Sequence, residues 1–207
     1  MNEMKGLTIM DEMRNPLRIL AFSDMHWYTN EELNRIKSLD YDLCVLLGDI
    51  PVPAVRLIKR YVDDKPLLAV AGNHDDWNTP ERGGAENIHG RCVTRCGYTF
   101  AGISGSARYK QGNYPMHTQR ESMKIGKKLE KADILLSHDS MYHLISRDDA
   151  HAGLLGIDLY NLKNRVKLNL CGHHHTPAIG KRWGTTTICV FRCALISYPN
   201  MTVEGIF

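Results

Sequence analysis

The stretch Gly72-Asn73-His74-Asp75 follows a short apolar run, Leu67 to Ala71, that is typical of a buried strand. Gly72 lets the backbone turn sharply where the strand ends. An amide oxygen, an imidazole and a carboxylate come directly after this turn. They offer a metal ligand, a general acid or base, and a group able to orient that imidazole. Because open α/β sheets place their sites at the carboxyl ends of strands, we interpret this stretch as the centre of a functional site.

Four other apolar runs of the chain end in the same way, in carboxylate or histidine residues. Any one of these residues alone would be read as a helix cap or a turn residue. The endings, in chain order, are Ser23-Asp24-Met25-His26, Gly48-Asp49, His138 and Gly172-His173-His174-His175. Five such blocks, each behind a predicted strand, favour a shared site over chance.

The ordered set D-x-H, G-D, G-N-H-D, H and G-H-x-H resembles the calcineurin-like metallophosphoesterases. Every signature block of that family is present in order between Asp24 and His175, which is most of the chain. The resemblance implies a four-layer αββα sandwich, in which two mixed β-sheets are flanked by helices. It also implies a metal-dependent phosphoric ester hydrolase with a binuclear metal centre.

The resemblance assigns seven metal ligands, with one carboxylate shared between two ions. One ion would be held by Asp24, His26, Asp49 and His175, and the other by Asp49, Asn73, His138 and His173. Independently of the family, residues i and i+2 of an extended segment point the same way, so Asp24 and His26 can reach one metal. The same spacing holds for His173 and His175, and we expect His174 between them to point elsewhere, as a supporting or exposed residue.

Mixed imidazole and carboxylate ligands favour transition metals over Ca²⁺ or Mg²⁺. We expect two divalent ions, with Mn²⁺ first and Fe, Zn, Co or Ni as alternatives. In the mechanism that the resemblance implies, a water bridging the ions loses a proton and attacks the phosphorus. His74 is then the candidate general acid for the leaving oxygen, and Asp75 could hold its tautomer and raise its pKa.

Candidates for substrate contact lie outside the blocks. Arg108 and Tyr109 follow the loop Gly102 to Ser106 and could touch a substrate phosphate, although they fit equally well as ordinary loop residues. His151 precedes Ala152-Gly153 and could lie on a lid. The remaining histidines, His89, His117 and His143, are expected at surface or internally satisfied positions.

The second and third blocks separate branches of the family. Protein serine/threonine phosphatases carry an arginine just before G-N-H and a G-D-x-x-D-R-G block. Here Ala71 precedes Gly72, and the second block continues Ile50-Pro51-Val52-Pro53, so both arginines are missing. This favours a phosphodiesterase acting on small molecules or nucleotides. The alternatives are a phosphomonoesterase or protein phosphatase, a nuclease for short oligonucleotides, and a non-catalytic scaffold, which would be expected to have gaps in the ligand set.

Composition limits the other possibilities. The 207 residues, 43% hydrophobic and 24% charged, fit one domain over residues 1–207 with residues 1–16 as an N-terminal arm. A net charge of +3 is too small to predict a stable nucleic-acid complex. The apolar runs are too short to span a membrane. The N-terminus carries Glu3, Asp11 and Glu12 and lacks a secretory pattern, so we expect a cytoplasmic enzyme with a small-molecule substrate.

The six cysteines fit a reducing compartment. Cys44 and Cys171 fall within predicted strands and are expected to pack as small apolar residues. Cys92/Cys96 and Cys189/Cys193 form two C-x3-C pairs. This is not the usual zinc spacing, so a structural zinc there is the less favoured interpretation.

Hydrophobic periodicity predicts a βαβαβ unit first and an all-β region last. After Asp75, residues 76–90 are expected to form a loop over the site. The predicted strands are 17–22, 43–47, 67–71, two short strands around Gly97, 134–137, 168–171, and antiparallel strands near 181–183, 185–193 and 201–206. The predicted helices begin at Thr29 or Asn30, near Val55, at about Thr118 and at Gly153.

Overall fold

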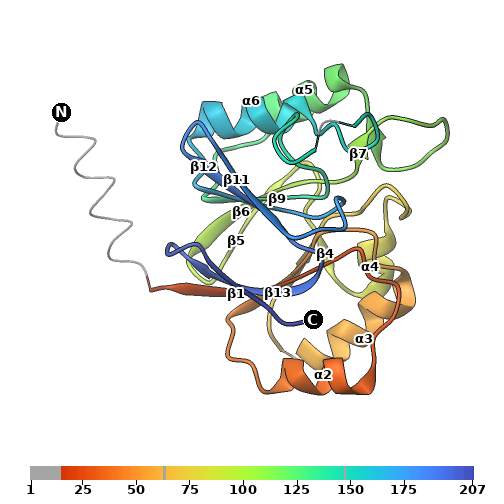
Figure 1. Ribbon diagram of the computed structural model, residues 1–207, viewed down its shortest axis with the longest axis vertical. Helices are drawn as coiled ribbons and strands as arrows, with labels where there is room; N and C mark the ends of the chain where they lie inside the picture. Colours follow the sequence, from red (N-terminus) through yellow and green to blue (C-terminus); the bar gives the residue numbers. More distant parts are fainter. Residues whose placement is uncertain (1–14, 63, 147) are drawn as a thin grey trace.

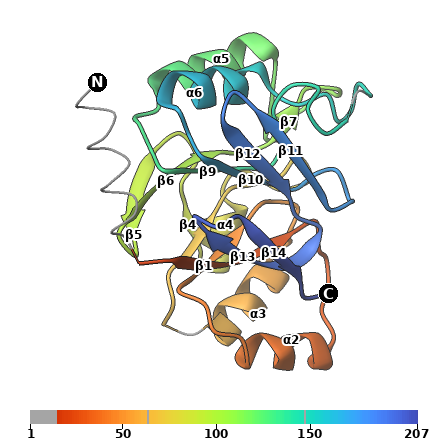
Figure 2. The ribbon, with the colours of Figure 1, turned by 60° about the vertical axis from the view of Figure 1, so that its left-hand side comes forward.

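The computed structural model describes residues 15–62, 64–146 and 148–207. Most of the predicted N-terminal arm therefore lies outside the described residues. Two six-stranded sheets pack face to face, and helices cover both outer faces (Figure 1). The same four layers are visible after rotation of the molecule (Figure 2). The predicted αββα sandwich is confirmed.

The first sheet has the strand order β14-β13-β1-β2-β3-β4. Strands β1 to β4 run parallel, while β13 and β14 are antiparallel additions at one edge. The strands are β1 (Leu17–Ser23), β2 (Leu43–Leu46), β3 (Leu67–Ala69), β4 (Glu86–Asn87), β13 (Arg192–Tyr198) and β14 (Thr202–Gly205), and the helices on this side are α2 (Asn30–Lys37), α3 (Val52–Val62) and the short α4 (Thr79–Gly83).

The second sheet has the order β11-β12-β10-β9-β6-β5, and its four central strands run parallel. Helices α5 (Gln119–Lys128) and α6 (Leu155–Asn164) lie over its outer face (Figure 1). Its strands are β5 (Cys92–Arg95), β6 (Tyr98–Ile103), β9 (Ile134–Ser137), β10 (Leu168–Cys171), β11 (Ala178–Arg182) and β12 (Thr185–Cys189); β7 (Ser106–Ala107) and β8 (Met116–His117) form a separate pair.

Strand β1 shows why the layers form. Its side chains alternate between two faces, and both faces are apolar. Ile19 and Ala21 join the core between the two sheets, whereas Leu20 and Phe22 join the core beneath α2 and α3. Because each large apolar side chain buried in this way stabilises the fold by about 1.5–3 kcal/mol, the strand needs cover on both sides.

Two helices begin where the sequence predicts. Thr29 and Thr118 each accept a hydrogen bond from the backbone amide of the third helical residue, and the carboxylates of Glu32 and Glu121 accept from the backbone amides of Thr29 and Thr118. These are complete capping boxes, which satisfy amides that the first helical turn leaves without partners. The start of α2 fixes the length of the loop between β1 and the helix, and this loop carries Asp24 and His26.

Two predictions about elements need correction. Residues 76–90 contain α4 and β4 as well as loop. The predicted strand 185–193 is two strands in different sheets, because Arg192 takes a left-handed φ of 65° and the chain crosses between the sheets there. Strand β12 is antiparallel to β11, as expected, but it also runs parallel to β10. Strands β13 and β14 are antiparallel to their neighbours, as expected.

The loops that carry the polar blocks meet at one edge of the sandwich. The Asp24 amide donates to the Gly48 carbonyl at 3.0 Å, which joins the first two blocks. The Gly172 amide donates to the His138 carbonyl at 2.9 Å, which joins the last two. The sheets therefore place carboxyl ends from both layers around one point.

None of the helices in the described part of the chain has the length and apolar character needed to cross a lipid bilayer. The cytoplasmic location stays a prediction.

Candidate metal centre

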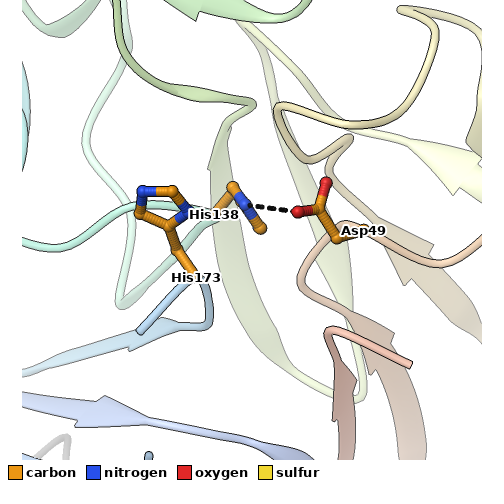
Figure 3. A group of neighbouring side chains, drawn as sticks. All are labelled: Asp49, His138 and His173. Carbon is orange, nitrogen blue, oxygen red and sulfur yellow. Dashed lines mark ion pairs between the residues drawn. The ribbon is translucent and has the colours of Figure 1, made fainter. Parts of the chain in front are cut away.

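Asp49, His138 and His173 converge from three separate strand ends (Figure 3). One ligand atom from each lies within 4.8 Å of the others, and all three residues are buried. They follow β2, β9 and β10, so both sheets contribute. A carboxylate and two imidazoles at this separation form a donor set suited to a transition metal.

Hydrogen bonds fix the orientation of His138. Its Nδ1 lies 2.7 Å from the Leu47 carbonyl, so Nδ1 carries the proton and Nε2 is the ligand atom when the ring is neutral. Nε2 lies 2.8 Å from Asn73 Oδ1 and 3.5 Å from Asp49 Oδ2. The amide oxygen of the G-N-H-D block therefore points into the same cluster as the carboxylate.

His173 is held in a similar way. Its Nε2 lies 2.9 Å from the Ala150 carbonyl, which leaves Nδ1 as the free ring nitrogen. Its backbone amide donates to Asp24 Oδ2 at 2.8 Å. The loop around Ala150 thus orients a candidate ligand histidine from the second sheet, while Asp24 from the first sheet anchors its backbone.

Asp24 and His175 form a second group beside the first. Asp24 Oδ1 lies 3.3 Å from His175 Nε2. Among the described residues, no hydrogen bond reaches this buried oxygen. A buried carboxylate oxygen without a hydrogen bond is costly unless a cation or another donor meets it. The donor chemistry of the site and this buried oxygen, which faces the His175 imidazole without a hydrogen bond in the described part of the chain, both fit divalent metal ions.

The backbone at these blocks is turned, not extended. Asp24, Asp49, His173 and His175 have φ angles of 53°, 54°, 70° and 51°. The argument from i and i+2 along an extended segment therefore fails here, and His173 and His175 separate into the two groups described above. Such left-handed non-glycine residues are uncommon and concentrate at functional sites.

Gly48 shows how closely the blocks approach one another. Its φ is 94°, and a Cβ at this position would lie 2.5 Å from the Gly72 amide nitrogen and 2.6 Å from His138 Nδ1. A side chain would push the second, third and fourth blocks apart. The glycine of the G-D block is thus required for the ligands to converge.

The pKa values of the three converging residues are coupled. Burial alone would raise the pKa of Asp49, but His138 and the His74 amide hold it below its usual range. Burial alone would lower the pKa of His138, but the Asp49 carboxylate raises it to about 10. Burial and the charge of His138 lower the pKa of His173 to about 3. Since a metal needs neutral imidazoles, it must displace the proton on His138.

Two histidines of the blocks lie apart from the converging group. His26 is exposed, and its side chain forms no hydrogen bond or ion pair within the described ranges. Its role as a ligand stays a prediction. The His174 side chain turns back and is buried, with Nε2 3.7 Å from Asp139 Oδ1. His174 therefore points away from its neighbours, as expected.

His74 and Asp75 occupy different environments. His74 is exposed, and its backbone amide donates to Asp49 Oδ1 at 2.8 Å. Asp75 is buried, and its Oδ2 accepts from the amides of Gly72 at 2.8 Å and Asp49 at 2.9 Å. Among the contacts of the described residues, none joins the Asp75 carboxylate to the His74 imidazole. Asp75 holds two site loops together in place of the predicted contact with the His74 ring.

Replacing Asp75 tests this bracing. Asp75→Ala would leave two buried amides without an acceptor, at about 1–3 kcal/mol each. Burial and the nearby Asp49 charge raise the pKa of Asp75 to about 7. Removing the carboxyl group therefore also removes the unfavourable free energy of burying its charge, which offsets part of the loss. We expect a net loss of about 2 kcal/mol in unfolding free energy at neutral pH, measured with denaturant. Asp75→Asn keeps an acceptor and should lose less unfolding free energy. Wild-type stability of Asp75→Ala would contradict the role of Asp75 in holding the two loops together.

The predicted substrate contacts are placed differently from one another. Arg108 forms an ion pair with Glu121 at 3.1 Å and donates to the Met116 carbonyl, so its guanidinium is engaged at the start of α5. Tyr109, the next residue, accepts a hydrogen bond from the Asn73 side-chain amide at its hydroxyl, at 2.9 Å. The loop reaches the site through the tyrosine.

His151 lies beside the converging group. Its ring is 4.7 Å from the ring of His173, and its Nδ1 lies 2.8 Å from Asp148 Oδ1. Asp148 accepts from this ring and from Ser146, and these bonds hold the pKa of Asp148 well below its usual range. The structure thus brings His151 to the edge of the site, where its substrate role stays a prediction.

The C-x3-C pairs are separated in the structure. All six cysteines are free thiols, and each pair sends its sulfurs to different carbonyls or into the core. Cys44 and Cys171 are fully buried within β2 and β10, as expected of small apolar residues.

This chain shares its superfamily and its fold with known proteins. The family model described as the calcineurin-like phosphoesterase superfamily domain matches residues 17–190, so the chain belongs to this superfamily. No curated protein matches the sequence.

Solved structures share the fold at low identity. The protein TT1561 of Thermus thermophilus is 15% identical, with a TM-score of 0.67 over 93% of this chain and 100% of that one. The phosphopantetheinyl hydrolase PptH of Mycobacterium tuberculosis is 12% identical, with a TM-score of 0.56 over 84% and 89%. A putative 5'-nucleotidase of Staphylococcus aureus is 12% identical, with a TM-score of 0.55 over 92% and 53%. These likenesses show the fold.

Proposed function

We propose that this protein is a phosphodiesterase that depends on two divalent metal ions, with Mn²⁺ as the expected metal. The observation that carries the proposal is the convergence of Asp49, His138 and His173 within 4.8 Å from both sheets. Asn73, Asp24 and His175 lie beside this group, and His26 belongs to the same predicted set. A complete ligand set argues against a scaffold that has lost its metals.

The residues of the site have two roles: the proposed ligands would hold the ions, and backbone carbonyls orient the ligand rings. Asp49, Asp24, His138, His173, His175, Asn73 and His26 would hold the ions. When bound, the ions would supply Lewis-acid activation of water and neutralise charge on the phosphate. The Leu47 and Ala150 carbonyls hold the rings of His138 and His173 so that they do not have to reorganise during the reaction.

His74 is the proposed general acid. Its backbone is bonded to Asp49 while its side chain remains exposed, so the imidazole can reach a substrate beside the ligands. It would give a proton to the leaving oxygen as the ester bond breaks. Asp75 would contribute by holding the loop through the Gly72 and Asp49 amides.

The charges around the site favour a monoanionic diester. A monoester dianion benefits from extra cations, and arginine is the usual residue for this purpose. Arg108 is paired with Glu121, and Arg82 is paired with Asp76 at 3.1 Å. Arg147 lies outside the described residues. The two engaged arginines cannot supply this charge without breaking their pairs.

The test compares two esters with the same leaving group. We expect a higher kcat/KM for bis-p-nitrophenyl phosphate than for p-nitrophenyl phosphate, measured with Mn²⁺ at neutral pH. The reason is that the diester carries less charge to be neutralised and needs space where an arginine would otherwise reach. A clear preference for the monoester would overturn the diester assignment and point to phosphatase activity supported by one of the arginines.

A further inference from the structure

A cavity of about 660 Å³ opens beside the loop that follows Asp75, and we call it the side cavity. Asp76 lines it and lies three residues after Asn73, so the two Cα atoms are at most about 11 Å apart. On the other side, Asn113 lines the cavity and belongs to the same loop as Tyr109, whose hydroxyl contacts Asn73. The side cavity is therefore connected to the candidate metal centre through two segments.

One wall of the side cavity is aromatic and well supported. Trp77 and His89 line it, with their ring centroids 5.3 Å apart. His117 stacks on His89 at 5.8 Å and meets Trp77 edge-on at 5.6 Å. Such ring contacts fix the wall in one arrangement. Trp77 is half-buried and lines the cavity.

Ser104 links this wall to the metal centre. Its amide donates to His89 Nδ1 at 2.9 Å, and its carbonyl lies 3.0 Å from His117 Nε2. Its hydroxyl accepts from the amide of Ala71, the residue just before the G-N-H-D block, at 3.0 Å. The wall and the block thus share one rigid support, so a ligand on the wall has a fixed position relative to the site.

The polar lining offers hydrogen bonds without surplus positive charge. Asp76 and Glu81 are acidic, and the cation of the lining, Arg91, is ion-paired with Glu86. Burial and the neighbouring His117 lower the pKa of His89 to about 4, so its ring is neutral at pH 7. A second phosphate would meet carboxylates here, whereas an uncharged polar group would not be repelled.

Three asparagines also line the side cavity and offer side-chain amides as hydrogen-bonding groups. Asn87 is engaged, since its Nδ2 donates to the Trp77 carbonyl and to Glu81. Asn78 precedes α4 and makes no side-chain capping bond, and Asn113 is exposed on its loop. Two side-chain amides among the residues that line the cavity therefore remain available for a ligand. Asparagine can pair with the edge of an adenine base, and base stacking on aromatic side chains is sequence-tolerant.

We propose that the side cavity binds the nucleobase of a nucleoside substituent on the phosphoester. The base would lie against Trp77 while Asn78 and Asn113 contact its edge, and the phosphate would extend toward Asn73 and Asp49. This inference rests on the proposed function for the position of the phosphate, but the cavity itself does not depend on catalysis.

The test is a calorimetric titration of the Mn²⁺-loaded protein with adenosine monophosphate and with methyl phosphate. Both probes carry the same phosphate group, so the ratio of their Kd values isolates the nucleoside. We expect adenosine monophosphate to bind at least about fivefold more tightly, which is the lower end of what the stacking of one base contributes. Adenosine alone should also bind, more weakly, with or without Mn²⁺.

Variants locate the contact. In the double variant Asn78→Ala/Asn113→Ala, the ratio of the Kd of methyl phosphate to the Kd of adenosine monophosphate should fall at least about threefold. Gln111→Ala is the matched control, because Gln111 is exposed on the same loop and does not line the cavity, so it should keep the wild-type ratio. Equal affinities of the two probes for the wild type, or a ratio unchanged in the double variant, would overturn the cavity assignment. A large ratio in a protein that hydrolyses no phosphoester would support the cavity and refute the proposed function.

Discussion

Asp49→Ala should lose at least about 10²–10³-fold in kcat/KM for bis-p-nitrophenyl phosphate, because it would weaken the binding of both proposed ions, whose positive charge would stabilise the transition state on this scale. Asp49 contacts His138 through Oδ2 and the His74 amide through Oδ1. One substitution therefore removes a ligand of both proposed ions and a support of the proposed general acid. Steady-state kinetics with saturating Mn²⁺ measures the loss.

Two further variants sharpen this test. Asp49→Asn keeps an oxygen for the His74 amide but lacks the charge, so it should lose nearly as much as Asp49→Ala. Asp40→Ala is the control: it removes an exposed carboxylate that pairs with Arg18, the second residue of β1, at the strand end opposite Asp24. This variant should keep wild-type rates. If Asp49→Asn were fully active, the carboxylate charge would have no part in the reaction.

His74→Ala should lose about 10²–10⁴-fold in kcat on diesters with poor leaving groups such as alkoxides, the range typical of a positioned general acid. The loss should shrink strongly with p-nitrophenol as the leaving group, because nitrophenolate hardly needs a proton. The measurement is the slope of log kcat against leaving-group pKa, which should be steeper in the variant than in the wild type.

The same series separates proton transfer from other roles of His74. A parallel decline across all leaving groups would mean that the side chain acts in binding or in loop structure. Metal content should remain at the wild-type level, since among the contacts of the described residues it is the backbone amide of His74, and not its imidazole, that bonds to the proposed ligand Asp49. A variant that lost its metals would instead place the imidazole among the ligands.

The sequence predicted most of what positions the site. Short apolar runs ending in Asp24, Asp49, Asn73, His138 and His173 did mark strand ends that meet at one edge. This worked because buried parallel strands are nearly continuous apolar runs, and the polar residue that ends each run is visible against them. The helix beginning at Thr29 was equally readable, since a capping box is a local pattern.

Other features depend on tertiary structure and leave no local signal. Val190 and Phe191 continue the apolar run of β12, so the passage of the chain into the other sheet at Arg192 could not be seen. His173 has a left-handed backbone, and its amide bonds to Asp24, which is far away in sequence. The sequence predicted Tyr109 and Arg108 as equal candidates for substrate contact. The structure shows that the Tyr109 hydroxyl accepts a hydrogen bond from Asn73.

Asp75 illustrates the limit for side-chain roles. Its position next to His74 suggested a direct contact, because adjacent residues are the partners that a sequence shows most readily. In the structure the two side chains diverge, one exposed and one buried, and Asp75 instead ties the Gly72 and Asp49 amides together. The partner amide at Asp49 becomes visible only once β2 and β3 lie side by side.

In the proposed centre, two ions share Asp49. The most direct measurement of this is the number of Mn²⁺ ions that the metal-free protein binds in a calorimetric titration. We expect two ions per chain for the wild type and weakened binding at both positions for Asp49→Ala. Binding of one ion or none by the wild type, or two sites of unchanged affinity in Asp49→Ala, would contradict the shared centre.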